Sequence, residues 1–81
     1  MKVQSDAQKR IVGTKQVLKA LAAGELERVY LAMDAEPFLL NKLKAACSAH
    51  GIQVEQVPTM KELGQQCKID VGAACAGERK E

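Results

Sequence analysis

The chain has 81 residues, 47% of them apolar and 27% charged, so it is long enough for one domain and too apolar for a disordered chain. Its formal net charge is +2, but residues 1–19 carry five basic residues and one acidic residue, and the remaining residues have a net charge of −2. This concentration of positive charge near the N-terminus indicates an anionic partner.

Several classes of protein are disfavoured by composition. Tyr30 and Phe38 are the only aromatic residues, which argues against a single-strand binder that stacks bases on rings. The cysteines at 47, 67 and 75 lack the Cys-x-x-Cys spacing, and the chain has one histidine, so we expect no metal and no cofactor, and buried thiols in a reducing compartment. We see no signal peptide and no apolar run of about 18 residues, and we therefore expect a cytoplasmic protein.

The N-terminal part of the chain is organised around a glycine turn. Residues 1–10 are polar with weak helical character, and residues 11–12 predict a short strand that ends at Gly13. Thr14 is expected to cap a helix over residues 15–23, because its hydroxyl can accept a hydrogen bond from a first-turn amide. The predicted buried face of this helix consists of Val17, Leu18, Leu21 and Ala22.

Two lysines at the start of this helix are unfavourable for the helix itself. Lys15 lies near the positive end of the helix dipole, and Lys19 follows one turn later on the same face. A bound polyanion would reverse both effects, because helix-start amides and lysines attract phosphate. The alternative is an exposed polar face that tolerates two lysines.

The middle of the chain predicts a strand and a long helix. Gly24 is expected in the left-handed conformation that ends a helix, and residues 25–28 are expected to form a charged loop. Residues 29–33 are a short apolar run typical of a central strand that is buried on both faces. The next helix is expected to start at residues 34–37, and Gly51 to close it. Its inner face is predicted to contain Leu39, Leu40, Leu43, Ala46, Cys47 and His50.

The C-terminal part predicts an edge strand, a helix and a final strand. Residues 52–57 alternate apolar and polar, and Thr59 with Glu62 matches a helix capping box. Residues 68–72 are expected to form a loop, residues 73–76 a last strand, and residues 77–81 a solvated charged tail. The predicted inner face of the last helix consists of Met60, Leu63 and Cys67.

This alternation of strands and helices predicts a three-layer α/β/α sandwich around a small sheet, in a single domain over residues 1–81. Catalytic signals are weak. Asp34 and Glu36 are better explained as helix-start residues, and His50 as a capped, partly buried structural residue. Residues 13–15 resemble a fragment of a phosphate loop without its second glycine.

The apolar loop around Ile69 and Val71 is the second candidate binding feature. This loop and the glycine turn each follow or precede an element of the same layer, so we expect them to lie next to each other at one end of the sheet. Apolar side chains beside a basic helix start could cover unstacked bases while lysines hold phosphates. Ordinary core packing beneath a loop is the alternative for both residues.

Four segments stand in the same order and spacing as in one known family: Gly13–Lys19, Val29–Pro37, Met60–Gly64 and Ile69–Ala74. They resemble the ribosomal protein L-seven-Ae family, most closely its small bacterial YbxF-like members, from about Ile11 to Ala76. The resemblance implies a four-stranded mixed sheet and an RNA-binding protein that recognises a kink-turn. In such RNA, tandem sheared G·A pairs adjoin a short bulge, and the backbone bends sharply.

The resemblance also implies site residues. Gly13 and Thr14 would form the turn, Lys15 and Gln16 would make polar base contacts, and Lys19 would contact the backbone or a base. The loop over the bulged nucleotides would consist of Ile69, Asp70 and Val71. The partner would be ribosomal RNA or a riboswitch, and we expect a monomer when the protein is free.

The chain departs from the family pattern at three places. Lys15-Gln16 replaces the Asn-Glu of archaeal and eukaryal members, so the base contacts differ. Lys68 stands where the family has glycine, and we expect the loop to leave its helix differently there. Gly77 and the charged tail are expected to curtail the last strand. The rival function is a protein-interaction module of the same fold, in which acids such as Glu62 or Asp70 would engage the lysines.

Overall fold

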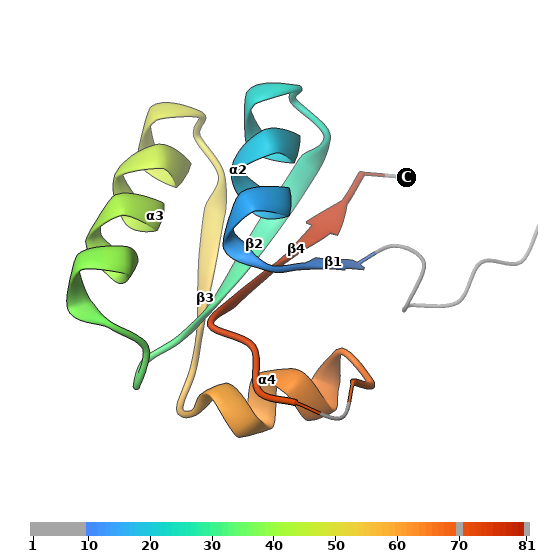
Figure 1. Cartoon of the computed structure of the whole chain (residues 1–81). Helices are drawn as coiled ribbons and strands as arrows, with labels where there is room; N and C mark the ends of the chain where they lie inside the picture. Colours follow the sequence, from blue (N-terminus) through green and yellow to red (C-terminus); the bar gives the residue numbers. More distant parts are fainter. Residues whose placement is uncertain (1–9, 70, 81) are drawn as a thin grey trace, which may run out of the picture.

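The computed structural model describes residues 10–69 and 71–80 (Figure 1). Four strands and three helices alternate along this part of the chain. They are β1 (Arg10–Val12), α2 (Thr14–Ala22), β2 (Leu26–Ala32), α3 (Pro37–Ala49), β3 (Gln53–Val57), α4 (Met60–Gln66) and β4 (Cys75–Arg79). The weak helix predicted over residues 1–10 lies outside the described residues, apart from Arg10, which begins β1.

The predicted three-layer sandwich with a mixed sheet is confirmed. The strands lie in the order β1-β4-β2-β3, with β2 and β3 parallel and β4 antiparallel to both of its neighbours. In Figure 1, α2 and α3 lie together on one side of the sheet and α4 on the other. The expected edge position of β3 and central position of β2 are therefore both correct.

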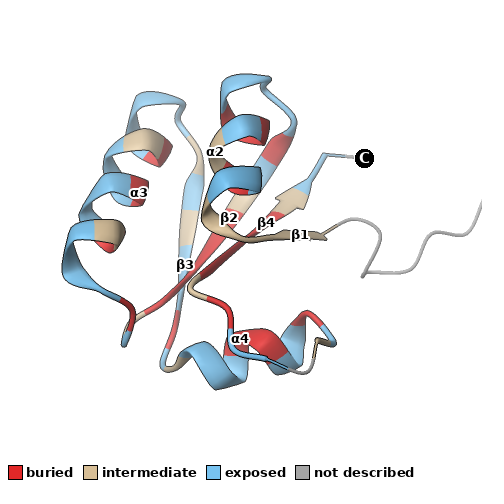
Figure 2. Cartoon of the chain, in the orientation of Figure 1, coloured by how far each residue is buried: buried red, intermediate tan, exposed pale blue. Residues whose placement is uncertain are grey.

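Strand β2 joins two separate cores because its side chains alternate between the faces of the sheet. Val29 and Leu31 pack in the core beneath α2 and α3, whereas Tyr30 and Ala32 pack in the core beneath α4. All four residues are buried (Figure 2). This two-sided burial explains the nearly continuous apolar run in the sequence.

Helix α2 and the start of β2 correct two predictions. Val17 and Leu21 are buried as expected, but Ala20 completes the buried face and Ala22 is exposed. Residues 25–28 are not a loop, because β2 begins at Leu26, which is only 1% exposed. Charged residues flank Leu26 in the sequence, so the local pattern does not indicate that the first residue of β2 belongs to the core.

The C-terminal strand corrects the prediction of a solvated tail. Strand β4 runs through Gly77, Glu78 and Arg79, and Gly77 is buried. A Cβ atom at Gly77 would lie 2.7 Å from a methyl group of Leu26, so a larger residue would force that buried leucine to shift from its place against β4. The glycine expected to curtail the last strand therefore stands inside it.

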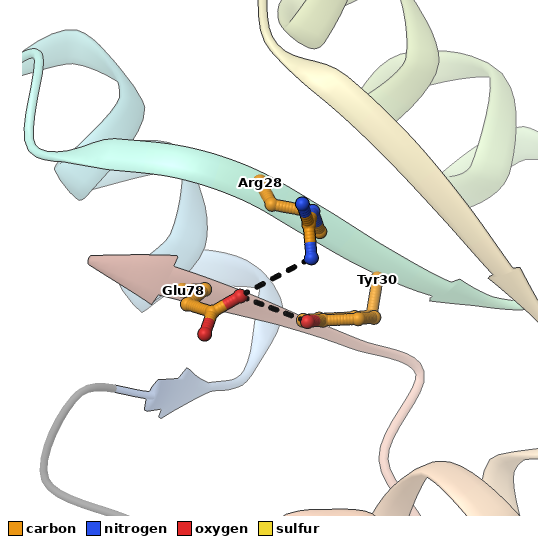
Figure 3. A network of polar contacts seen from close by, with 3 residues as sticks. All are labelled: Arg28, Tyr30 and Glu78. Atoms are coloured by element: carbon orange, nitrogen blue, oxygen red, sulfur yellow. Dashed lines mark hydrogen bonds and ion pairs between the residues drawn. The ribbon is translucent and has the colours of Figure 1, made fainter. Parts of the chain in front are cut away.

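Glu78 belongs to a polar cluster on the α4 side of the sheet. Its carboxylate accepts a hydrogen bond of 2.9 Å from the Tyr30 hydroxyl and lies 3.7 Å from an Arg28 nitrogen (Figure 3). Arg10 places its guanidinium over the Tyr30 ring, 5.1 Å from the centroid. These contacts connect β1, β4 and β2, the three strands that bear these residues, and so explain why Glu78 is not a tail residue.

The turn between β2 and α3 corrects the interpretation of Asp34. Helix α3 begins at Pro37, and Glu36 at its N-cap makes no side-chain capping bond. Asp34 instead accepts a 2.8 Å hydrogen bond from the Met60 amide at the start of α4. The carboxylate therefore joins the turn before α3 to the start of α4, which is 26 residues later in the sequence.

The ends of α3 and α4 confirm some predicted positions and correct others. Thr59 caps α4 as predicted, accepting a 3.1 Å bond from the Glu62 amide. Leu63 and Cys67 are buried as expected, but Met60 is 37% exposed. His50 is also exposed, as the C-cap residue of α3, so the prediction of a partly buried histidine is wrong.

All three helices end in the same left-handed turn. Gly24 and Gly51 adopt it with φ of 72° and 67°, and Lys68 adopts it with φ of 61°. After α4, the Lys68 amide donates to the Gln65 carbonyl and the Ile69 amide to the Gly64 carbonyl, the pair of bonds typical of this helix end. The loop thus leaves α4 in the ordinary way, and the expectation of a different exit is wrong.

Replacing Lys68 by glycine should stabilise the protein. A side chain in the left-handed region carries strain, and its removal outweighs the extra freedom of glycine in the unfolded chain by about 0.5–1 kcal/mol. We expect Lys68→Gly to raise the Tm by roughly 2–8 °C in a thermal melt. Lys68→Ala is the matched control, because it removes the charge but keeps Cβ. Equal Tm values for the two variants would contradict this account.

The three cysteines should react slowly and destabilise the fold at high pH. All are buried, and burial raises the pKa of the Cys47, Cys67 and Cys75 thiols. Thiols of the unfolded chain ionise first, so the unfolded state binds fewer protons, and the free energy of unfolding should fall as the pH rises above about 8.5. Urea titrations across that range measure the effect. Iodoacetamide labelling as fast in native as in urea-unfolded protein would contradict the burial.

Candidate nucleic-acid interface

Gly13 holds the start of α2 against β4. Its amide donates a 3.2 Å hydrogen bond to the Cys75 carbonyl, and its own carbonyl accepts the first helical bond, 2.9 Å from the Val17 amide. Gly13 has φ 108°, a conformation that side-chain-bearing residues rarely adopt. The glycine turn predicted from the sequence therefore anchors the helix start by its backbone alone.

Thr14 does not cap α2, which corrects the sequence prediction. It is the first residue of the helix, and Gly13 occupies the capping position without a side chain. The half-buried Thr14 hydroxyl lies 3.7 Å from the Cys75 sulfur, which is placed to donate to it. No side chain caps the first turn of α2, so its amides are left for solvent or a ligand.

Lys15, Gln16 and Lys19 are all exposed on α2. The first turn of this helix contains no acidic residue. Among residues 10–69 and 71–80, no ion pair engages Lys15 or Lys19, so Glu62 does not hold either lysine. Asp70, the other acid that the rival function would use, lies outside the described residues. Lys15 therefore leaves the positive end of α2 uncompensated. Lys19 lies in the last turn, where the helix dipole favours a cation, which corrects the expectation that both lysines are unfavourable for the helix.

The loop before β4 separates the roles of Ile69 and Val71. Ile69 is half-buried and packs against the core beneath α4, whereas Val71 is 69% exposed. The chain crosses α4 so closely that a Cβ atom at Gly64 would overlap the Val71 carbonyl. The Ala73 amide then donates a 3.0 Å bond to the Met60 carbonyl. Core packing therefore explains Ile69, and Val71 remains available to a partner.

The helix start and the loop lie at the same end of the sheet, as the sequence predicted. The loop enters β4 at Cys75, whose carbonyl and sulfur contact Gly13 and Thr14. The Ala74 carbonyl also accepts a 2.9 Å bond from the Ala32 amide at the end of β2. Figure 1 shows the red segment that enters β4 beside the blue start of α2. Four of the site residues named from the sequence, Gly13 to Gln16, thus lie at the start of α2, and Lys19 lies in its last turn. Ile69 and Val71 belong to the loop that enters β4 beside the helix start, and Asp70 lies outside the described residues.

Sequence reasoning missed one residue near this surface. Arg79, at the end of β4, lines a shallow hollow of about 180 Å³ together with Gln16 and Lys19 of α2. Arg79 is 60 residues from Lys19 in the sequence and lies in the segment predicted to be a tail, so the sequence gives no sign that the two residues are close. Only the pairing of β4 with β1 and β2 brings the two cations to one hollow.

The described residues contain no group of three or more His, Cys, Asp or Glu side chains placed to hold a metal ion. In the same part of the chain, no helix is long and apolar enough to cross a membrane.

Comparisons with known proteins agree with the fold and with the sequence resemblance. A model of the Ribosomal protein L7Ae/L30e/S12e/Gadd45 family matches residues 1–81. "RNA-binding protein TTE2299" of Caldanaerobacter subterraneus is 50% identical over 70 residues, which is 86% of this chain and 85% of the relative. "RNA-binding protein YbxF" of Geobacillus stearothermophilus is 44% identical over 68 residues, covering 84% of this chain and 83% of the relative.

A solved structure gives the same result. The "15.5kD RNA binding protein" of Giardia lamblia superposes with a TM-score of 0.84 at 28% identity, over 91% of this chain and 62% of that one. The family match over the whole length and the close relatives lead to one conclusion: this chain belongs to the Ribosomal protein L7Ae/L30e/S12e/Gadd45 family.

Proposed function

We propose that this protein is a non-catalytic RNA-binding protein that recognises and stabilises a kink-turn. The observation that carries the proposal is the exposed, uncapped start of α2, with Lys15, Gln16 and Lys19, beside the loop that presents Val71. The printed names of the relatives, which call them RNA-binding proteins, support an RNA partner. The partner would be ribosomal RNA or a riboswitch, bound by a monomeric protein in the cytoplasm.

Attraction of RNA to this surface would begin with charge. The free amides of the first turn and Lys15 together form an anion-binding helix start, and Lys19 adds a cation one turn further along α2. Phosphate contacts of this kind accelerate encounter and position the RNA, but they carry no sequence information. Lys15 and Lys19 therefore supply affinity that should weaken with salt.

Recognition of the bent RNA would come from Gln16 and the loop. The Gln16 amide both donates and accepts hydrogen bonds, which suits the exposed edges of sheared G·A pairs. The exposed Val71 side chain offers an apolar surface for a nucleotide that has left the stack. Since neither group needs a particular stem sequence, the proposed recognition is of RNA shape.

The first test compares two RNAs of equal length. One contains a kink-turn, and in the other Watson–Crick pairs replace the tandem sheared G·A pairs. We expect the replacement to abolish specific binding in a fluorescence-anisotropy titration, because the edges and the bend disappear together, while changes in stem sequence should have little effect. Equal affinity for both RNAs would leave only charge attraction. Absence of binding to either RNA would favour the protein-interaction module.

The second test separates phosphate contact from base contact. Lys19→Ala should weaken binding to both RNAs and lower the slope of log K against log salt by about one. Gln16→Ala should cost roughly 1–3 kcal/mol on the kink-turn and little on the straight duplex. Neither change should lower the Tm, because both side chains are exposed.

Lys44→Ala provides the matched control for Lys19→Ala, because Lys44 is equally exposed but lies on α3. It removes the same charge and should change affinity less than twofold. If Lys19→Ala unfolds the protein, or if Gln16→Ala binds the kink-turn normally, the proposed site is misplaced.

A further inference from the structure

A hollow lies on the outer side of α2, between that helix and the ends of β1 and β4. Its volume is about 180 Å³, and its apolar lining comes from Ile11, Ala20 and Ala23. Its polar lining consists of two cations, Lys19 and Arg79, together with the Gln16 amide and the Glu25 carboxylate. Two of these residues, Gln16 and Lys19, already belong to the proposed RNA site.

Arg79 has a fixed backbone but an exposed side chain. It is the last residue of β4, paired with Leu26 of β2, and the next amide, that of Lys80, donates a 2.9 Å bond to the Glu25 carbonyl. Within the part of the chain that the structure describes, no ion pair joins Glu25 to Lys19 or Arg79. Two cations thus face one hollow, and among the described residues no carboxylate lies within salt-bridge distance of either.

We propose that this hollow holds a backbone phosphate of the bound RNA between Lys19 and Arg79, so that the RNA interface extends along α2 from its start toward its C-terminal end. This proposal rests on the proposed function. From Gln16 to Ala23 the helix rises about 10 Å, a distance that a few nucleotides of an RNA strand can span. A strand that contacts Gln16 and continues along α2 therefore reaches Arg79.

The chemistry of the hollow favours a phosphodiester. A guanidinium presents a planar set of donors that matches phosphate oxygens, and the ammonium of Lys19 adds a second charge from the opposite wall. The apolar lining lowers the local polarity beneath these groups and so strengthens their attraction for an anion. Glu25 acts in the opposite direction, because its carboxylate repels phosphate at the same rim.

The test is a salt series of kink-turn binding for four proteins: the unmodified chain, Arg79→Ala, Arg79→Lys and Lys44→Ala. We expect Arg79→Ala to weaken binding roughly five- to tenfold at low salt and to reduce the salt slope by about 0.9. Arg79→Lys should restore most of the affinity, because it keeps the charge. The control Lys44→Ala should stay within twofold of the unmodified chain.

Glu25→Gln gives a result of opposite sign. Removing the repelling carboxylate should tighten binding two- to threefold, most clearly at low salt, with no change in the Tm. If Arg79→Ala equals Lys44→Ala, or Glu25→Gln leaves affinity unchanged, the phosphate site is wrong although the proposed function stands. If the unmodified chain binds no RNA, both proposals fail together.

Discussion

The contact between Gly13 and Cys75 is the constraint on which the candidate site depends. The 3.2 Å bond from the Gly13 amide to the Cys75 carbonyl joins the start of α2 to the start of β4. Because β1 and α2 follow each other through this turn, the same bond sets where the first helical amides point. The loop that carries Val71 ends at the same residue, Cys75, two residues after its bond to Met60. Both halves of the candidate site therefore share one anchor.

The surface of α2 is a compromise between helix stability and the proposed binding. A helix start gains stability from acidic residues and loses it from lysines, yet the first turn of α2 contains no acid. The buried face, with Val17, Ala20 and Leu21, compensates by fixing the helix to the sheet and to α3. Stability thus comes from the inner face, which leaves the outer face available for charge.

The sequence predicted the parts of the fold in which local pattern and tertiary structure agree. The alternation in β3 and the apolar run in β2 report burial directly, since strands have a regular periodicity. The capping of α4 was predictable because Thr59 and Glu62 are three residues apart. Leu26 and Gly77 escaped prediction because they determine each other: the glycine leaves the space that the leucine fills, across 51 positions of the chain. Asp34 was assigned to its own helix because its true partner, Met60, belongs to another element. For the candidate site, the sequence predicted that Lys15, Gln16 and Lys19 face away from the core, and they are exposed, but Arg79 approaches Gln16 and Lys19 only through strand pairing.

The sheet order has a consequence for synthesis of the chain on the ribosome. Strand β4 is made after every other described element, yet it lies between β1 and β2, the first two described strands. Until residues 75–79 have left the exit tunnel, β1 has no neighbour in the sheet and Gly13 has no acceptor at Cys75. The parallel pair β2 and β3 with its crossover helix α3 uses nearer contacts and is free to form earlier. The start of α2 therefore acquires its anchored geometry only after β4 has emerged, so a nascent chain has the charges of the candidate binding surface before it has their arrangement.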